Sequence, residues 1–186
     1  MPYLAMTDYE TASPEVRAEF DDQIEKHGRI TNMKRTLLQD VPSFKTYMEW
    51  YGLFDAIEPF TGNRPLILFC YAISSGNDCL VCSTFFRQIL IDAGDDPDNP
   101  QLSEMESLLM DLGQAIARDP HNIPQRIYDG LKEDFTEKQI VQLIAFAGIM
   151  YATNLFNTVA KVPLDEVLYD YQKKTGPSDG ETARQA

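Results

Sequence analysis

Two of the chain's three cysteines, Cys79 and Cys82, lie close together in the stretch SSGNDCLVCSTFF. A C-x-x-C pair can act as a redox dithiol, supply half of a metal site, or pack as two small core residues. In a reducing compartment, where structural disulfides are rare, such a pair points to redox catalysis or metal binding before a structural bridge. The function of the chain depends on which of these roles the pair has.

The residues around the pair predict how it is positioned. Asn77 or Asp78 is suited to be the N-cap of the following helix, and either choice places Cys79 in its first turn. Free backbone N–H groups and the helix dipole stabilise a thiolate there, whereas the Asp78 carboxylate disfavours one. Cys82 falls on the same helix face, and so does Phe86, where a general base would assist proton transfer.

A zinc site would need at least two ligands besides the pair. Cys70, inside the apolar stretch LILFCYAI, is expected to be a core residue, and the two histidines, His27 and His121, have no ligand-like spacing. The acidic stretch DAGDDPDNP lacks the spacing of a calcium loop. We therefore expect no metal and no cofactor, and we favour a redox dithiol over inert core packing.

The composition restricts the partners of the protein. The 186 residues carry a formal net charge of −13, which disfavours binding to nucleic acid and to anionic membrane surfaces. The first residues, MPYLAMTDYETASPE, do not have the pattern of a signal peptide. The longest apolar run, IVQLIAFAGIMYA, includes Gln142 and is shorter than the roughly 20 residues of a membrane-spanning helix. We expect a cytoplasmic protein.

Caps and apolar periodicity predict helices along the whole chain. Ser13 with Pro14 begins the first helix and Gly28 ends it. The uniformly apolar stretch LILFCYAISS fits a strand or a helix, and we prefer a helix because no other segment offers a strand to pair with it. Two later helices begin with the pattern of a capping box, Ser103 with Glu106 and Thr136 with Gln139.

These elements predict one helical domain over residues 1–174, with residues 1–27 as an N-terminal helical extension and residues 175–186 as a flexible tail. The aromatic stretch YMEWYGLF is expected to be core rather than the lining of a substrate pocket. The last long helix is apolar nearly all round its middle, which predicts burial on most sides and a subunit interface as one way to achieve it.

Three segments, in order, resemble the carboxymuconolactone decarboxylase and alkyl hydroperoxidase D-like superfamily, most closely its peroxidase-related branch. The segment RPLILFCYAISSGNDCLVCSTFFRQILIDAG is similar to the family's apolar helix, short turn and C-x-x-C. GRITNMKRTLLQDVPSF resembles the family's upstream stretch, and FTEKQIVQLIAFAGIMYATNLFNTVAKVPLDE resembles its C-terminal core helix. The resemblance spans residues 28–167.

The resemblance implies an all-α hydroperoxidase D-like helical bundle, with the C-x-x-C at a helix N-terminus, that forms a homo-oligomer through its helices. It implies a thiol-dependent oxidoreductase that reduces small hydroperoxides or disulfides and is re-reduced by a partner dithiol. By position, it makes Cys82 the attacking thiol and Cys79 the resolving thiol.

The chain departs from the family at the residues that handle protons. The family's redox motif has a glutamate and a histidine at the positions that hold Ile67 and Phe86 here. Nothing in the sequence recruits Glu58, Arg64 or His121 in their place. Two alternatives to the redox function therefore remain. The first is a non-redox binding or scaffold oligomer of the same fold, and the second is zinc binding through the cysteine pair.

Overall fold

The computed structural model describes residues 2–173, which form helices and no strand. The all-α fold class predicted from the sequence is confirmed, whereas the predicted flexible tail, residues 175–186, lies outside the described residues. The α-helices are α1 Pro14–His27, α2 Asn32–Leu37, α3 Val41–Thr61, α4 Asn63–Gly76, α5 Leu80–Asp92, α6 Glu104–Arg118, α7 Gln125–Asp134 and α8 Glu137–Val159, and a 3₁₀ helix, η1, spans Glu166–Tyr171.

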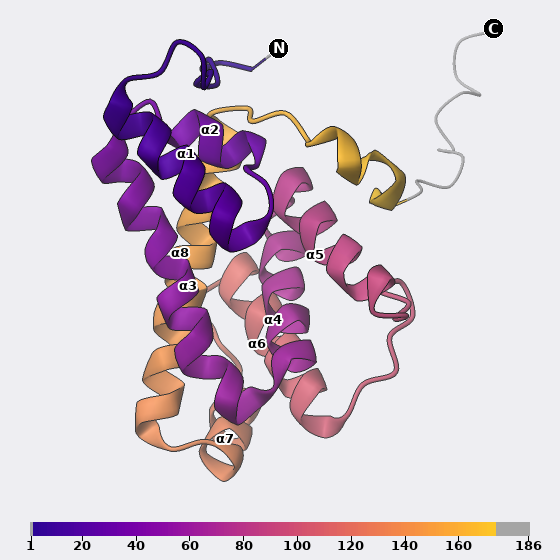
Figure 1. Cartoon of the computed structure of the whole chain (residues 1–186). Coiled ribbons are helices and arrows are strands. Elements are labelled where there is room, and N and C mark those ends of the chain that lie inside the picture. Colours follow the sequence, from indigo (N-terminus) through magenta and orange to yellow (C-terminus); the bar gives the residue numbers. More distant parts are fainter. Residues whose placement is uncertain (1, 174–186) are drawn as a thin grey trace, which may run out of the picture.

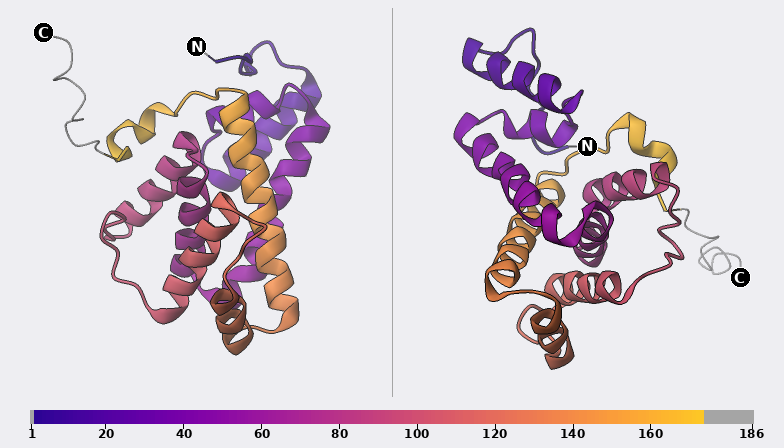
Figure 2. Two further views of the ribbon diagram at one scale, coloured as in Figure 1. Left: turned by 180° about the vertical axis from the view of Figure 1, so that it is seen from behind. Right: turned by 60° about the horizontal axis from the view of Figure 1, so that its bottom comes forward.

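Helix α4 is the centre of the bundle. It packs against α3, α5, α6 and α8, and the right-hand view of Figure 2 shows these helices around it. Every side chain from Leu66 to Ser74 is buried, which explains why this stretch is apolar without any periodicity. The preference for a helix over a strand at this segment is confirmed. The 3₁₀ helix η1 packs against α5, and Figure 1 shows it beyond the upper end of α8.

The predicted caps fix the ends of several helices. The Ser13 side chain accepts the Val16 backbone N–H to begin α1, and Gly28 ends α1 with a φ of 72°, a left-handed conformation that favours glycine. Both predicted capping boxes form, one at the start of α6 and one at the start of α8. The ends of these helices thus lie where the local sequence predicts them.

The turn between α4 and α5 differs from the prediction. Asn77 is the C-cap of α4, Asp78 has a φ of 53°, and the N-cap of α5 is Cys79 itself. The prediction that Asn77 or Asp78 caps α5 is therefore wrong, because the left-handed Asp78 delays the helix by one residue. The Cys79 N–H donates to the Ser74 carbonyl at 3.0 Å, so that the end of α4 holds the first residue of the cysteine pair.

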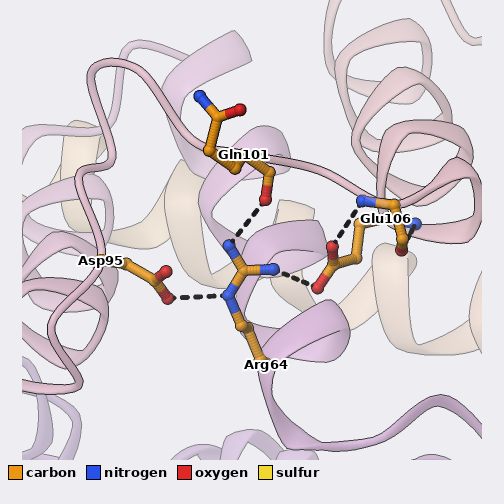
Figure 3. Close-up of polar contacts among 5 residues, drawn as sticks. Arg64, Asp95, Gln101 and Glu106 are labelled. Atoms are coloured by element: carbon orange, nitrogen blue, oxygen red, sulfur yellow. Dashed lines mark hydrogen bonds and ion pairs between the residues drawn. The ribbon is translucent and has the colours of Figure 1, made fainter.

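An ionic cluster fastens the start of α4 to the loop between α5 and α6 (Figure 3). The Arg64 guanidinium donates to Asp95 Oδ2 at 2.8 Å, to the Gln101 carbonyl at 3.1 Å and to the Glu106 carboxylate. The Glu106 carboxylate also accepts the Ser103 backbone N–H, as part of the capping box of α6. Each of the three guanidinium nitrogens of Arg64 therefore has a structural hydrogen-bond partner.

Helix α8 is buried along one side only. Its core side carries Leu143, Phe146, Ala147, Met150, Thr153, Asn154 and Asn157. Its other side exposes Val141, Ile144, Tyr151, Leu155 and Val159. The expectation of burial on most sides is therefore not met within one chain. By length and composition α8 could cross a membrane, a test that the core helix of a soluble protein also passes.

Candidate active site

A cavity of about 430 Å³ opens beside Cys82. Its volume falls in the range of small-molecule binding sites. Residues of α2, α3, α4, α5 and α8 form its wall, together with the ends of α1 and η1. The wall is mostly apolar and rich in aromatic and methionine side chains, which are Met33, Tyr47, Met48, Trp50, Tyr51, Phe54, Phe85, Phe86 and Met150.

The aromatic stretch of α3 contributes a large part of this wall. Tyr47, Trp50, Tyr51 and Phe54 are half-buried and line the cavity. These four side chains therefore line a pocket, where the sequence predicted core. Trp50 and Phe54 still pack against the core, with Trp50 ring to Phe146 ring at 5.5 Å, so the stretch is both a wall of the cavity and an edge of the core.

Cys79 lies behind the cavity wall and acts as the N-cap of α5. Its side chain is 1% exposed, and its Sγ accepts the backbone N–H of Cys82 at 3.5 Å. A cysteine sulfur in this place stands where Ser, Thr, Asn or Asp usually caps a helix. The thiolate form is stabilised there, because the helix N-terminus offers free N–H groups and the positive end of the dipole.

Cys82 lines the cavity itself. Its Sγ accepts a hydrogen bond from Asn157 Nδ2 of α8 at 3.1 Å, and the same amide contacts Met33 Sδ of α2 at 3.4 Å. Of the two sulfurs that the sequence predicts to be catalytic, only the second belongs to the cavity wall. Asn157 lies in the NLFN stretch of the family-like segment, but its sequence position alone gave it no role.

The two sulfurs share one proton. The S–H of Cys82 donates to Cys79 and lowers the Cys79 pKa to about 7, with further hydrogen bonds from the Cys82 backbone N–H and the Thr158 hydroxyl. The pKa of Cys82 is raised well above its usual range, because it keeps the shared proton and is buried. Of the two thiols, Cys79 is therefore the one that ionises first.

The positions that hold the proton-handling residues in the family motif do face this cavity. Ile67 and Phe86 both line it, so apolar side chains stand where a glutamate and a histidine would. Glu58, Arg64 and His121 are not in its wall. Arg64 belongs to the ionic cluster, and His121 is an exposed residue of the loop between α6 and α7.

A polar cluster lines another part of the cavity. Lys34 Nζ donates to Gln23 Oε1 at 2.5 Å and to the Tyr51 hydroxyl at 2.8 Å. The His27 ring stacks on the Tyr51 ring at 4.0 Å. Sequence reasoning gave this cluster no role, because its members come from three helices, α1, α2 and α3.

Cys70 and the metal hypothesis can be judged from the same region. Cys70 is fully buried in α4, as predicted for a core residue, and burial raises the pKa of its thiol. Within residues 2–173, no three His, Cys, Asp or Glu side chains are grouped so that they could hold a metal ion. The described part of the chain thus offers the cysteine pair no further ligands.

No family model matches the sequence, and no curated protein is significantly similar to it. Solved structures share its fold. An uncharacterized peroxidase-related protein from Silicibacter sp. TM1040 has a TM-score of 0.69 and 16% identity, over 90% of this chain and 94% of that one. The alkylhydroperoxidase AhpD core protein from Ralstonia eutropha JMP134, which is also peroxidase-related, has a TM-score of 0.69 and 14% identity over the same shares.

The debrominase Bmp8 is a third structure with this fold. As a cysteine-to-alanine variant in complex with 2,3,4-tribromopyrrole, it has a TM-score of 0.70 and 17% identity, over 92% of this chain and 96% of that one. Structural similarity at such low sequence identity establishes the fold only. The activity has to be argued from the site. The chain has the all-helical fold of these peroxidase-related, alkylhydroperoxidase AhpD core and debrominase structures.

Proposed function

We propose that the protein is a thiol-dependent oxidoreductase that reduces hydroperoxides or disulfides through a dithiol–disulfide cycle of Cys79 and Cys82. One observation carries the proposal. The Cys82 sulfur lines a cavity large enough for a substrate, and its thiol donates to a Cys79 sulfur whose pKa is about 7. The site thus has a nucleophile that a substrate can reach and a base that can take its proton.

In the first step, the Cys82 sulfur attacks the terminal oxygen of a hydroperoxide ROOH. Its proton passes to the Cys79 thiolate, an S–O bond forms and the O–O bond breaks. The alkoxide leaves and takes this proton from Cys79, which gives ROH, a Cys82 sulfenic acid and again a Cys79 thiolate. The Cys79 thiolate supplies the general base that Ile67 and Phe86 cannot supply. Asn157 Nδ2 donates to the sulfur on which negative charge develops.

In the second step, the Cys79 thiolate attacks the Cys82 sulfenic sulfur. An S–S bond forms, the S–O bond breaks, and the departing hydroxide takes up a proton to give water. A partner dithiol then reduces the disulfide by thiol–disulfide exchange and is itself oxidised. A disulfide substrate enters the same cycle, with a thiolate as the leaving group in place of the alkoxide. We infer a small dithiol or a dithiol protein as the reductant.

A second candidate reaction is the reductive removal of a halogen from an aromatic ring. The aromatic wall of the cavity favours a flat ring beside Cys82, and the fold also occurs in a debrominase. The balance would be ArBr + 2 RSH → ArH + RSSR + HBr, in which two thiols are oxidised and the ring carbon is reduced. The non-redox alternative, a binding or scaffold oligomer, shares the cavity but makes no use of the shared proton.

We further propose a cytoplasmic location and a homo-oligomer. A reducing compartment suits three free thiols, and a net charge of −13 disfavours nucleic-acid and membrane partners. The exposed apolar stripe of α8, defined as Val141, Ile144, Tyr151, Leu155 and Val159, supports a second copy as the partner of that helix.

The proposed function is tested by turnover with a supplied dithiol. Purified protein is given dithiothreitol with cumene hydroperoxide, with a small disulfide or with tribromopyrrole, and thiol consumption and bromide release are measured. Cys82→Ser should abolish turnover. Cys79→Ser, which lacks both the base and the resolving thiol, should form a Cys82 sulfenic acid slowly, and dimedone should trap it. Cys70→Ala, a core change away from the cavity wall, is the matched control. Full turnover by Cys82→Ser, or no turnover of any of the three oxidants, would overturn the redox function.

A further inference from the structure

The buried lysine at the cavity, Lys34, has no acidic partner among the residues that the structure describes. Its side chain is among the buried charged groups of the chain, with 5% exposure. Within residues 2–173, no aspartate or glutamate lies within salt-bridge distance of its Nζ. Removing an ammonium from water costs free energy that is normally offset by an opposite charge. A lysine in this place therefore calls for a compensating group.

The hydrogen bonds of Lys34 leave one of its donors free. An ammonium has three N–H groups, and two of them are used by Gln23 Oε1 and the Tyr51 hydroxyl. The Tyr51 hydroxyl oxygen accepts from the lysine, and the Tyr51 O–H donates to no acceptor among the described residues. Lys34 and Tyr51 both line the cavity, which gives one N–H and one O–H donor for the same ligand atom or group.

The charges around the cavity give it a single positive excess. Two basic side chains, Lys34 and Arg29, line it with one carboxylate, Asp165. Asp165 accepts the Asn32 backbone N–H at 2.9 Å. His27 also lines the cavity, and burial and the neighbouring Lys34 lower its pKa, which favours the neutral ring. The side chains that line the cavity thus carry a formal excess of one positive charge, on a protein with a net charge of −13.

Lys34 directly follows Met33, a residue that contacts the amide bound to the Cys82 sulfur. Met33, which immediately precedes Lys34, contacts Asn157 Nδ2, and that amide donates to the Cys82 sulfur. Two consecutive residues of α2 therefore connect the two parts of the cavity. Met33 contacts the amide that binds the Cys82 sulfur, and Lys34 belongs to the polar cluster. The aromatic wall of α3 lines the same cavity, with Trp50 and Phe54 among its members.

We propose that the cavity selects an apolar, preferably aromatic, carboxylate, whose anionic group binds Lys34 Nζ and the Tyr51 hydroxyl while its apolar body lies along the aromatic wall toward Cys82. A single carboxylate matches the single positive excess, whereas a phosphate would bring about two charges. As a substrate of the redox site, this carboxylate would also carry the hydroperoxide or disulfide that the cysteine pair reduces. The inference rests on the proposed function for the reaction, and on the geometry of the cavity for the binding.

The experiment uses an unreactive pair of probes that differ in one charge, 4-tert-butylbenzoate and 4-tert-butylbenzamide. Binding to the full-length protein is measured at pH 7 by calorimetry and by the fluorescence of Trp50, the single tryptophan, which lines the cavity. The benzoate should bind about 10- to 100-fold more tightly than the benzamide, as a charged hydrogen bond allows. Cys82→Ser should keep this preference, which separates binding from redox chemistry.

Variants decide whether Lys34 is responsible. Lys34→Met should bring the two dissociation constants within about threefold of each other, and Lys34→Arg should restore the preference for the anion. Lys132→Met, a change of an exposed lysine on α7, is the control and should change nothing. If Lys34→Met does not fold, Tyr51→Phe decides, with an expected loss of about 3- to 10-fold in benzoate binding.

Two results would overturn the inference. One is equal binding of the two probes by the unaltered protein, and the other is an unchanged preference in folded Lys34→Met. A protein that lacks turnover but keeps a preference that Lys34→Met removes would refute the redox function and support the carboxylate site. A protein with turnover but no such preference would do the reverse.

Discussion

Asn157 of α8 donates its side-chain N–H to the Cys82 sulfur of α5, with 3.1 Å between Nδ2 and Sγ. This bond joins residues that are far apart in sequence, and it favours negative charge on the sulfur that faces the cavity. Because the proposed first step creates such charge, the contact has a consequence for rate that can be measured separately from its consequence for stability.

Asn157→Ala should lower kcat/KM for the hydroperoxide by about 10- to 100-fold, the value of a hydrogen bond to a developing charge. Steady-state kinetics with dithiothreitol measures the effect. Asn154→Ala, one turn earlier on α8, is the matched control, because Asn154 is equally buried but contacts Ser74 instead of the cysteine. Equal losses in the two variants would indicate that both residues only support packing.

The ultraviolet absorbance of thiolate should rise with a midpoint near pH 7, because Cys79 ionises at about that pH. Cys82→Ala should move the midpoint upward toward the ordinary value of 9, since the variant lacks the S–H donor. Cys82→Ser keeps a hydroxyl donor and should shift the midpoint less. A midpoint of the unaltered protein above 8.5 would contradict the shared proton.

The same ionisation links the reduced protein's stability to pH. A lowered pKa in the folded state adds stability that is fully present above about pH 9 and is lost as the pH falls through about 7. Compared with Cys79→Ser, the reduced protein should therefore have a free energy of unfolding that decreases as the pH is lowered from about 9 to about 7. Urea unfolding at several pH values tests this, and a difference that stays constant with pH would contradict it.

Phe86→His should raise hydroperoxide turnover, because it places a titratable group at the cavity wall beside Cys82. General acid–base assistance is worth about 100- to 10,000-fold in favourable geometry, and we expect at least about 10-fold here. Phe86 is 3% exposed, so the variant should also lose about 2 kcal/mol of stability. Phe86→Gln, polar but not titratable at neutral pH, is the control. Equal rates for the two variants would show that protons do not limit turnover.

Leu155→Glu should shift the protein from oligomer to monomer in sedimentation velocity, because it places a charge in the middle of the exposed apolar stripe of α8. Leu155 is 57% exposed, so the monomer fold should keep its circular dichroism. Ser107→Glu, at an exposed position of α6, is the control and should leave the assembly unchanged. An unaltered protein that sediments as a monomer at all concentrations would rule out the homo-oligomer.

Much of the fold was predictable because its determinants are local. Capping side chains such as Ser13, Ser103 and Thr136 act on backbone groups within three residues, and they mark helix ends that the structure confirms. The central helix α4 was predictable for a related reason, since only a helix surrounded by others can be apolar on every face. The 3₁₀ helix η1 carries no such pattern and was not predicted.

The candidate site was predictable only as far as the pair itself. Cys79 and Cys82 stand out by their spacing, but the groups around them come from other helices. Lys34 meets Gln23 and Tyr51 through the packing of α1, α2 and α3, and no spacing along the chain encodes that contact. The N-cap was misassigned because Asp78 takes a left-handed conformation that a short turn rarely signals in its sequence.

The Cys79 sulfur that caps α5 is also one of the two atoms that a disulfide would consume. Oxidation would remove a negative charge from the start of the helix. The redox state of the pair and the stability of α5 are therefore thermodynamically coupled. Each part of the folded structure that holds the reduced thiolate in place makes the disulfide a stronger oxidant by the same free energy. The difference in unfolding free energy between the reduced and oxidised forms therefore measures how far folding shifts the reduction potential of the disulfide. That potential sets the driving force of the reaction with the dithiol partner.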